Sequence, residues 1–143
     1  ATRLIKYNTS YHYHPAGPPI IPFPAQECGQ GPDFKDFFKL NNRVRSRLNE
    51  DKTIYETLFK GKLDSLTEGG TFVELGAFDG SIESNTMFFE RCLGWKGLLI
   101  EGNPENYWKV LKNRPLSHRM SFAPSCDAEY ERVNKTVQFY RYP

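Results

Sequence analysis

The stretch that decides the fold is TFVELGAFDGSIESNTMFFERCLGWKGLLIEGN, residues 71 to 103 of the 143-residue chain. Thr71–Leu75 is a short apolar run that ends in a glycine-bracketed bend, Gly76–Gly80. Helical spacing of apolar residues follows in Ser84–Leu93, and a second apolar run occupies Gly97–Ile100. The order strand, bend, helix, strand predicts a parallel βαβ unit, and therefore an α/β fold.

Acidic residues lie near the ends of both predicted strands. Glu74 precedes the bend, and Glu101 follows the second strand 21 residues after Gly80 (101 minus 80). This separation is close to the roughly 20 residues between a glycine turn and a ribose-binding acid in dinucleotide folds. The pattern favours a nucleoside site at the carboxyl ends of the strands, since ribose hydroxyls can donate to such an acid. The alternative is a tight turn without a ligand and a solvated acid at a strand end.

The bend differs from a pyrophosphate-binding turn. Gly76 and Gly80 give G-x-x-x-G rather than G-x-G-x-x-G, and Glu74 would repel a pyrophosphate. These two features disfavour a nucleotide-dependent oxidoreductase. They favour S-adenosylmethionine, whose ammonium and sulfonium groups are cationic, with peptide amides after Gly76 approaching its methionine part.

The segment from Phe72 to Pro115 resembles the first half of FkbM-type methyltransferases, a branch of the class I S-adenosylmethionine-dependent enzymes. The resemblance implies a Rossmann-like class I methyltransferase sheet and methyl transfer to a hydroxyl oxygen of a small molecule or sugar. The later D-V-E-G-x-E-like motif of the family does not occur, so we expect the sheet to be incomplete in this chain. Strands after the third would normally supply the acceptor site, and we assign no catalytic residue.

The resemblance also implies a set of cofactor contacts. The motif around the bend would hold the cofactor, Glu101 would bind the ribose, and Asn103 would flank the adenine. We expect a third strand in 118–126, leading to Asp127, whose carboxylate would accept a hydrogen bond from the adenine amino group. The predicted cofactor-binding residues are Glu74, Gly76, Ala77, Asp79, Gly80, Glu101, Asn103 and Asp127.

The remaining segments divide the chain into an extended proline- and aromatic-rich arm, residues 1–32, and a methyltransferase-like part, residues 33–143. We expect the arm to lie along the domain or a partner. Amphipathic patterns predict two helices before the first strand. The first covers Asp33–Leu48, with Asp33 as its N-cap, and the second covers residues 52–59. Another is predicted from Asn103-Pro104 to before Pro115, and a further strand in 136–142. The packing face of the helix after Asn103 is predicted to hold Tyr107, Trp108 and Leu111.

Composition limits the remaining possibilities. A net charge of +2 from 19 basic and 17 acidic residues is untypical of a nucleic-acid binder, and no apolar stretch predicts a membrane span. Cys28, Cys92 and Cys126 are widely spaced, so we expect reduced thiols and no metal site. The odd cysteine count favours an intracellular setting and argues against use of the glycosylation triplets at Asn8 and Asn134. The chain begins with alanine rather than methionine, which favours, within that intracellular setting, an organelle reached with a targeting segment that is later removed.

Two hypotheses of different classes follow. The first is the cofactor-binding half of an S-adenosylmethionine-dependent O-methyltransferase. The second is a structural or accessory subunit without catalytic activity that retains the half-fold. In that case the arm, residues 1–32, and an open sheet edge would hold a protein partner, because an unpaired edge strand needs covering.

Overall fold

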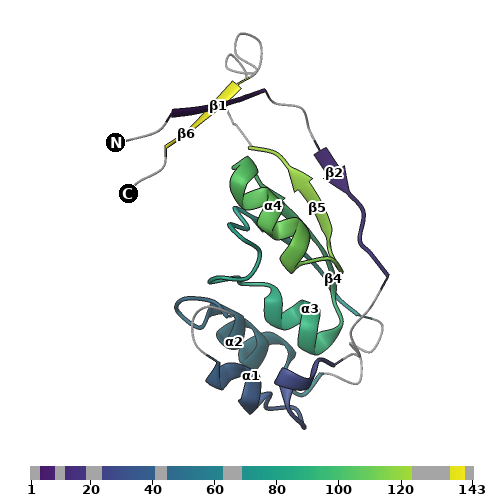
Figure 1. Ribbon diagram of the computed structural model, residues 1–143. Coiled ribbons are helices and arrows are strands. Elements are labelled where there is room, and N and C mark those ends of the chain that lie inside the picture. The colour runs from purple at the N-terminus through teal and green to yellow at the C-terminus, as the bar shows by residue number, and fades with distance from the viewer. Residues whose placement is uncertain are drawn as a thin grey trace.

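The protein is an α/β domain built on a four-stranded mixed open sheet, seen here in a computed structural model (Figure 1). The strand order is β2-β5-β4-β3, in which β2 is His12–His14, β5 His118–Ser121, β4 Lys96–Glu101 and β3 Thr71–Leu75. A separate two-stranded ladder pairs β1, Leu4–Asn8, with β6, Thr136–Tyr140. The structure describes residues 4–8, 12–18, 24–40, 45–62, 69–123 and 136–140.

The predicted βαβ unit is present. β3 pairs in parallel with β4, so that Glu74 lies opposite Leu99. The connecting helix α3, Met87–Leu93, begins later than predicted from the apolar pattern. Ser84 is the reason, because its Oγ accepts hydrogen bonds from the peptide N–H groups of Thr86 and Met87 and ends the loop before the helix.

Helix α4, Pro104–Asn113, follows β4 with the predicted start. Asn103 is its N-cap and accepts a 2.9 Å hydrogen bond from the peptide N–H of Glu105, which confirms the capping prediction. Tyr107 and Val110 are buried, but Trp108 is 69% exposed. The predicted packing of Trp108 on the sheet is therefore wrong, since a residue one position after Tyr107 is rotated by about 100° around the helix axis.

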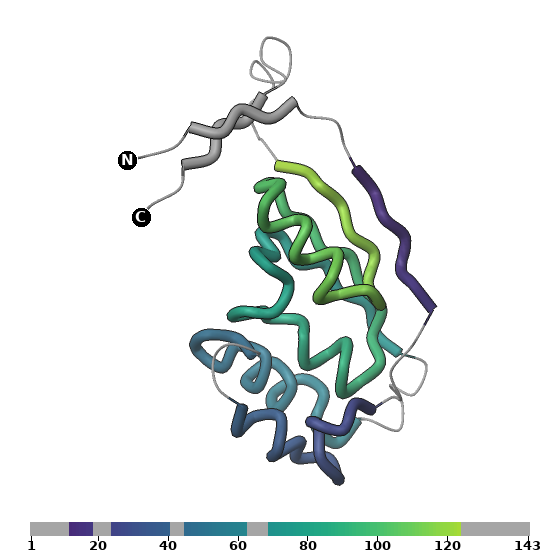
Figure 2. The backbone as a smooth tube through the Cα atoms, in the orientation of Figure 1, coloured from purple at the N-terminus to yellow at the C-terminus, as the bar shows by residue number. Residues whose placement is uncertain are grey.

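The amino-terminal segment contributes strands. β2 pairs antiparallel with β5 at the edge of the main sheet, as the backbone trace shows (Figure 2). The hydroxyl of Tyr107 lies 2.8 Å from Nδ1 of His14 and fixes this strand to helix α4. For His12–His14, the expectation that the arm lies along the domain is confirmed. β1, Leu4–Asn8, pairs antiparallel with β6, Thr136–Tyr140, which confirms the predicted last strand.

Of the two helices predicted before β3, the first is shorter than predicted, whereas the second, predicted over 52–59, is present as a continuous helical segment over 50–59. α1 covers only Lys35–Lys39, and Phe34 rather than Asp33 precedes it, without a side-chain cap. The long helix predicted for Asp33–Leu48 is therefore wrong: its amphipathic pattern spans α1 and part of the segment leading to the next helix, α2, Glu50–Ile54. A π-helical turn, η2, Tyr55–Phe59, continues α2.

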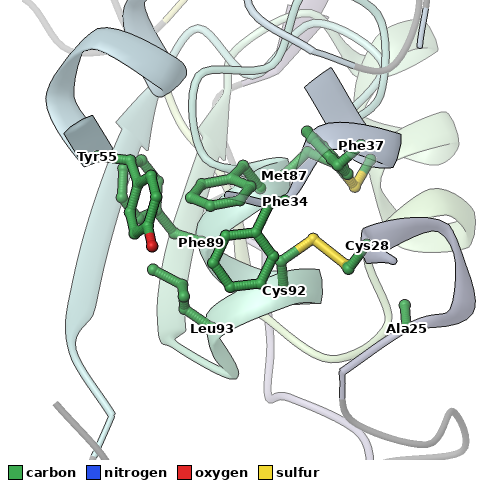
Figure 3. Packing of buried hydrophobic residues seen from close by; sticks show 10 residues of the cluster. Ala25, Cys28, Phe34, Phe37, Tyr55, Met87, Phe89, Cys92 and Leu93 are labelled. Carbon is green, nitrogen blue, oxygen red and sulfur yellow. A yellow bond between two sulfur atoms is a disulfide. The ribbon is translucent and has the colours of Figure 1, made fainter. Parts of the chain in front are cut away.

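Aromatic side chains from these helices and α3 form the larger hydrophobic core (Figure 3). Phe88 is fully buried and contacts the rings of Phe34, Phe37 and Tyr55. Ring pairs of this kind contribute about 0.5 to 1.5 kcal/mol each beyond the burial of area. This core holds α1, η2 and α3 together.

A disulfide joins Cys28 to Cys92 inside that core, with an S–S distance of 1.99 Å. Cys28 lies in the 3₁₀ turn η1, Gln26–Cys28, and Cys92 in α3. The prediction of reduced thiols is wrong for this pair. The two cysteines are 64 residues apart in the sequence, and only the tertiary fold brings such distant residues close enough to form a disulfide. The sequence alone therefore did not indicate the pairing.

The two faces of the main sheet differ in their covering. Leu99 and Val110 are fully buried together, which places α4 on the face of β4 that carries Leu99. Side chains alternate along β3, and Val73 and Leu75 point to the opposite face, where they are 64% and 62% exposed. β3 is also the last strand of the described sheet. Its outer edge and one of its faces are open in the described part of the chain.

Candidate functional site

A cavity of about 420 Å³ lies over the bend that follows β3. The bend runs from Gly76 to Gly80 at the carboxyl end of a parallel strand, the position at which open α/β sheets bind ligands. The cavity therefore overlaps the predicted nucleoside site at Glu74, Gly76 and Ala77. Its lining consists of Glu74, Gly76, Ala77, Phe78, Ile82 and Glu83.

The end of β4 holds the bend in place. The peptide N–H groups of Gly76 and Ala77 both donate to the carbonyl oxygen of Ile100, at 2.9 and 3.1 Å. The N–H of Phe78 donates to Oε2 of Glu101 at 2.7 Å. The amides of Ala77 and Phe78, which the sequence predicts to approach the methionine part of the cofactor, therefore already donate their hydrogen bonds to the neighbouring strand.

The two glycines of the bend have different roles. Both have positive φ, at +73° for Gly76 and +79° for Gly80. A Cβ on Gly80 would lie 2.9 Å from Cγ of Arg114 and 3.3 Å from Cα of Val110, so this position needs glycine for packing. A Cβ on Gly76 would have no neighbour within 4 Å. Gly76 thus leaves room on the cavity side of the bend, which a larger side chain would occupy.

Glu101 is a buried acid beside the bend, with both carboxylate oxygens hydrogen-bonded. Oε2 accepts from Phe78, and Oε1 accepts from the peptide N–H of Asn103 at 2.7 Å. Burial raises the pKa of Glu101 above its ordinary value, and the hydrogen bonds from the peptide groups of Asn103, Phe78 and Gly102 offset part of that rise. An ionised carboxylate has about four lone-pair positions, and these three peptide donors use three of them, so one position remains for a further hydrogen bond, such as one from a ribose hydroxyl.

We expect the raised pKa of Glu101 to appear in the pH dependence of stability. A carboxyl with a higher pKa in the folded chain binds more protons there, so its contribution is complete below its ordinary pKa of 4.5 and is lost as pH rises through the folded pKa. Relative to Glu101→Gln, the wild type should lose unfolding free energy over that rise. Urea unfolding of both proteins across this pH range measures the difference, with Glu105→Gln as the charge control. A pH-independent difference would contradict the prediction.

Glu74 is part of a hydrogen-bond network as well as of the cavity wall. Its carboxylate accepts from the Ser84 hydroxyl and the Asn85 peptide N–H, both at 3.0 Å, and from the Thr86 hydroxyl. These donors lie in the loop that enters α3. Glu74 therefore fixes the start of α3 in addition to placing negative charge at the cavity.

Arg114, at the end of α4, connects this network to the bend. Its side chain is fully buried, and its Nε donates to Oε1 of Glu90 at 2.8 Å. Its Nη1 donates to the Gly80 carbonyl at 3.2 Å and lies 3.7 Å from Glu74. Ser84 and Thr86 accept from the same guanidinium. The buried guanidinium of Arg114 thus interacts with two carboxylates and donates a hydrogen bond to the backbone of the bend.

The other predicted site residues are placed differently. Asp79 Oδ1 accepts from the N–H groups of Ser81 and Ile82, at 2.8 and 2.7 Å, so this oxygen shapes the turn. The Asn103 side chain caps α4. Asp127 lies outside the described residues. The structure brings Glu74, Gly76 and Ala77 together at the cavity.

Sequence reasoning missed three lining residues, Phe78, Ile82 and Glu83. Phe78 and Glu83 are non-glycine residues with positive φ, at 51° and 56°. Such strained conformations concentrate at functional sites. The residue types phenylalanine and glutamate do not indicate a positive φ. The one signal in the sequence was position, since Phe78 lies within the predicted bend and Glu83 lies in the loop after it.

Comparisons with protein-family models, with curated proteins and with solved structures found no match to this chain. Within the described ranges, no group of three or more histidine, cysteine or acidic residues is arranged to hold a metal ion. No helix in the part of the chain covered by the structure has the length and apolar character needed to cross a membrane.

Proposed function

We propose that this chain is the cofactor-binding half of an S-adenosylmethionine-dependent methyltransferase, similar to FkbM-type enzymes, with a Rossmann-like class I sheet. In this proposal a small-molecule or sugar hydroxyl is the methyl acceptor. The parallel β3–α3–β4 unit and the bend at its carboxyl edge support it. The acceptor site and the catalytic groups belong to parts of the fold that the described sheet lacks.

The observation that carries the proposal is the charge of the cavity lining. Among the described residues, the lining holds two carboxylates, Glu74 and Glu83, and no basic side chain. Each carboxylate has a basic partner outside the lining, Arg114 at 3.7 Å from Glu74 and Arg47 at 3.8 Å from Glu83, which offsets part of the negative charge. A pyrophosphate would be repelled there, whereas the ammonium and sulfonium of S-adenosylmethionine would be attracted. Phe78 and Ile82 add apolar surface to the same wall, which suits the uncharged parts of the ligand.

The geometry of the bend supports a specific orientation of the cofactor. Gly76 leaves the space in which the methionine part would lie. Glu101, which lies beside the bend and outside the cavity lining, would accept a hydrogen bond from the ribose. Asn103 and Asp127 remain predicted contacts of the adenine. Arg114 holds both Glu74 and the Gly80 carbonyl, so it positions the cavity wall without contacting the ligand.

We expect Gly76→Val to weaken cofactor binding by about tenfold or more, equivalent to 1.4 kcal/mol per tenfold. The new side chain would extend into the open side of the bend, where a Cβ has no neighbour within 4 Å. Calorimetric titration of the full chain with S-adenosylhomocysteine measures the affinity, and circular dichroism monitors the fold.

Gly61→Val is the matched control for that substitution. Gly61 also has a positive φ, +86°, and open space around its Cβ position, but it lies outside the cavity lining. Both variants carry similar backbone strain, of about 1 to 2 kcal/mol. Equal affinities of the two variants would refute the assignment of Gly76 to the cofactor site.

A structural or accessory subunit is the second candidate function. It is favoured by the open edge of β3, whose exposed Val73 and Leu75 leave an apolar strip beside unpaired backbone groups in the described sheet. The absence of binding heat with S-adenosylhomocysteine at high concentration would favour this candidate over the methyltransferase.

A further inference from the structure

The Cys28–Cys92 disulfide is a structural bond within the core. Cys28 is 0% and Cys92 2% exposed, and both belong to the aromatic cluster (Figure 3). Redox-active cysteines need solvent access and commonly occur in C-x-x-C motifs. Neither condition holds for this pair. It is therefore a bond that the folded protein retains.

Buried structural disulfides are typical of proteins that fold in an oxidising compartment, such as the endoplasmic reticulum lumen, and are rare in the cytosol. The expectation of an intracellular setting depended on the odd cysteine count, and a buried disulfide between two of the three cysteines is the stronger argument for the compartment. The argument against use of the glycosylation triplets depended on the same premise.

The chain contains two acceptor triplets for N-linked glycans, Asn8-Thr9-Ser10 and Asn134-Lys135-Thr136. Asn8 is the last residue of β1 and lies opposite Thr136, the first residue of β6. Both triplets therefore reach the same end of the two-stranded ladder. Asn134 itself lies outside the described residues.

We propose that Asn8 carries an N-linked glycan and that the chain folds in an oxidising secretory lumen. The amide nitrogen of Asn8 forms a bond to the anomeric carbon of a lipid-linked oligosaccharide donor. The bond from that carbon to the lipid diphosphate breaks, the lipid diphosphate leaves, and a base accepts the amide proton. No oxidant or reductant takes part in this transfer.

The order of synthesis favours Asn8 over Asn134 as the acceptor. Chains are made from the amino terminus, and parts that emerge first begin to fold first. Asn8 precedes both cysteines of the disulfide, so its triplet enters the lumen before that bond can close. Asn134 is synthesised after Cys92, so the disulfide-linked core can already form before the Asn134 triplet enters the lumen. This inference is independent of the proposed methyltransferase activity.

The test uses the full protein isolated from its natural source. Treatment with peptide N-glycosidase in heavy-oxygen water converts a glycosylated asparagine to labelled aspartate, which mass spectrometry locates in the digest. We expect the label at Asn8, together with faster electrophoretic migration after the treatment. An unlabelled Asn8, or label at Asn134 alone, would overturn the proposal.

Two variants expressed in the same source separate the acceptor triplet from the fold. Ser10→Ala removes the triplet and retains Asn8, and we expect complete loss of the label at Asn8. Ser10→Thr preserves the triplet and should retain the label. Labelling of Asn8 in the Ser10→Ala protein, or no labelling in the Ser10→Thr protein, would contradict the assignment.

Discussion

Arg114→Met should lower the free energy of unfolding by about 3 to 5 kcal/mol, the range measured when one partner of a buried ion pair is removed. The substitution leaves the buried carboxylate of Glu90 without its 2.8 Å partner. Glu74 loses a cation 3.7 Å away, and the Gly80 carbonyl loses a hydrogen-bond donor. Urea denaturation, followed by circular dichroism, measures the change.

Lys112→Met is the matched control for Arg114→Met. Lys112 is an exposed cation in the last turn of the same helix, and surface substitutions of this kind usually change stability by less than about 0.5 kcal/mol. In a Glu90→Gln background, Arg114→Met should lower the free energy of unfolding by less than it does in the wild type, because the buried charge of Glu90 is already absent. Equal effects of Arg114→Met and Lys112→Met would show that the buried network does not stabilise the fold.

Removal of the Cys28–Cys92 disulfide should have an effect of similar size. In the chain-entropy account, a cross-link that closes a loop with a 64-residue separation stabilises the folded state by about 4 kcal/mol. We expect Cys28→Ser/Cys92→Ser to shift the urea midpoint by a corresponding amount. The bond also fastens η1 to α3, where the Ala25 N–H donates to the Arg91 carbonyl at 3.0 Å.

A reducing agent provides the control for the disulfide. It should destabilise the wild-type protein and leave the Cys28→Ser/Cys92→Ser protein unchanged, because the variant lacks the bond. If wild-type protein unfolds at the same urea concentration with and without the reducing agent, with reduction of the bond verified by thiol alkylation, the predicted stabilisation is wrong.

Local sequence signals predicted those helices and strands that are specified by interactions between residues close together in the sequence. β3 and β4 follow from apolar runs ended by glycine or acid, and both were predicted within one residue of their bounds. The start of α4 follows from Asn103-Pro104, where the cap and the fixed proline φ act on adjacent peptide groups. The pattern was insufficient for α1, because amphipathic spacing does not distinguish one helix from two segments of the same core.

Part of the candidate site could be predicted in the same way. Glu74, Gly76 and Ala77 were expected from the bend and line the cavity. For Phe78 and Glu83 the sequence offered only their positions in the bend and in the loop after it, since their positive φ values depend on how the surrounding loop is held. The use of the Ala77 and Phe78 amides by β4 also depends on strand pairing rather than on the residue types.

By itself, the sequence determined the strand–bend–helix–strand order and the acids at the strand ends, because hydrophobic periodicity and turn chemistry act over a few neighbouring residues. Only the tertiary structure decided which distant groups meet. It joined Cys28 to Cys92, paired β2 with β5 across more than 100 residues, and buried Arg114 between Glu74 and Glu90. The physical reason is that burial and charge pairing depend on how packed elements are arranged, which local propensity does not encode.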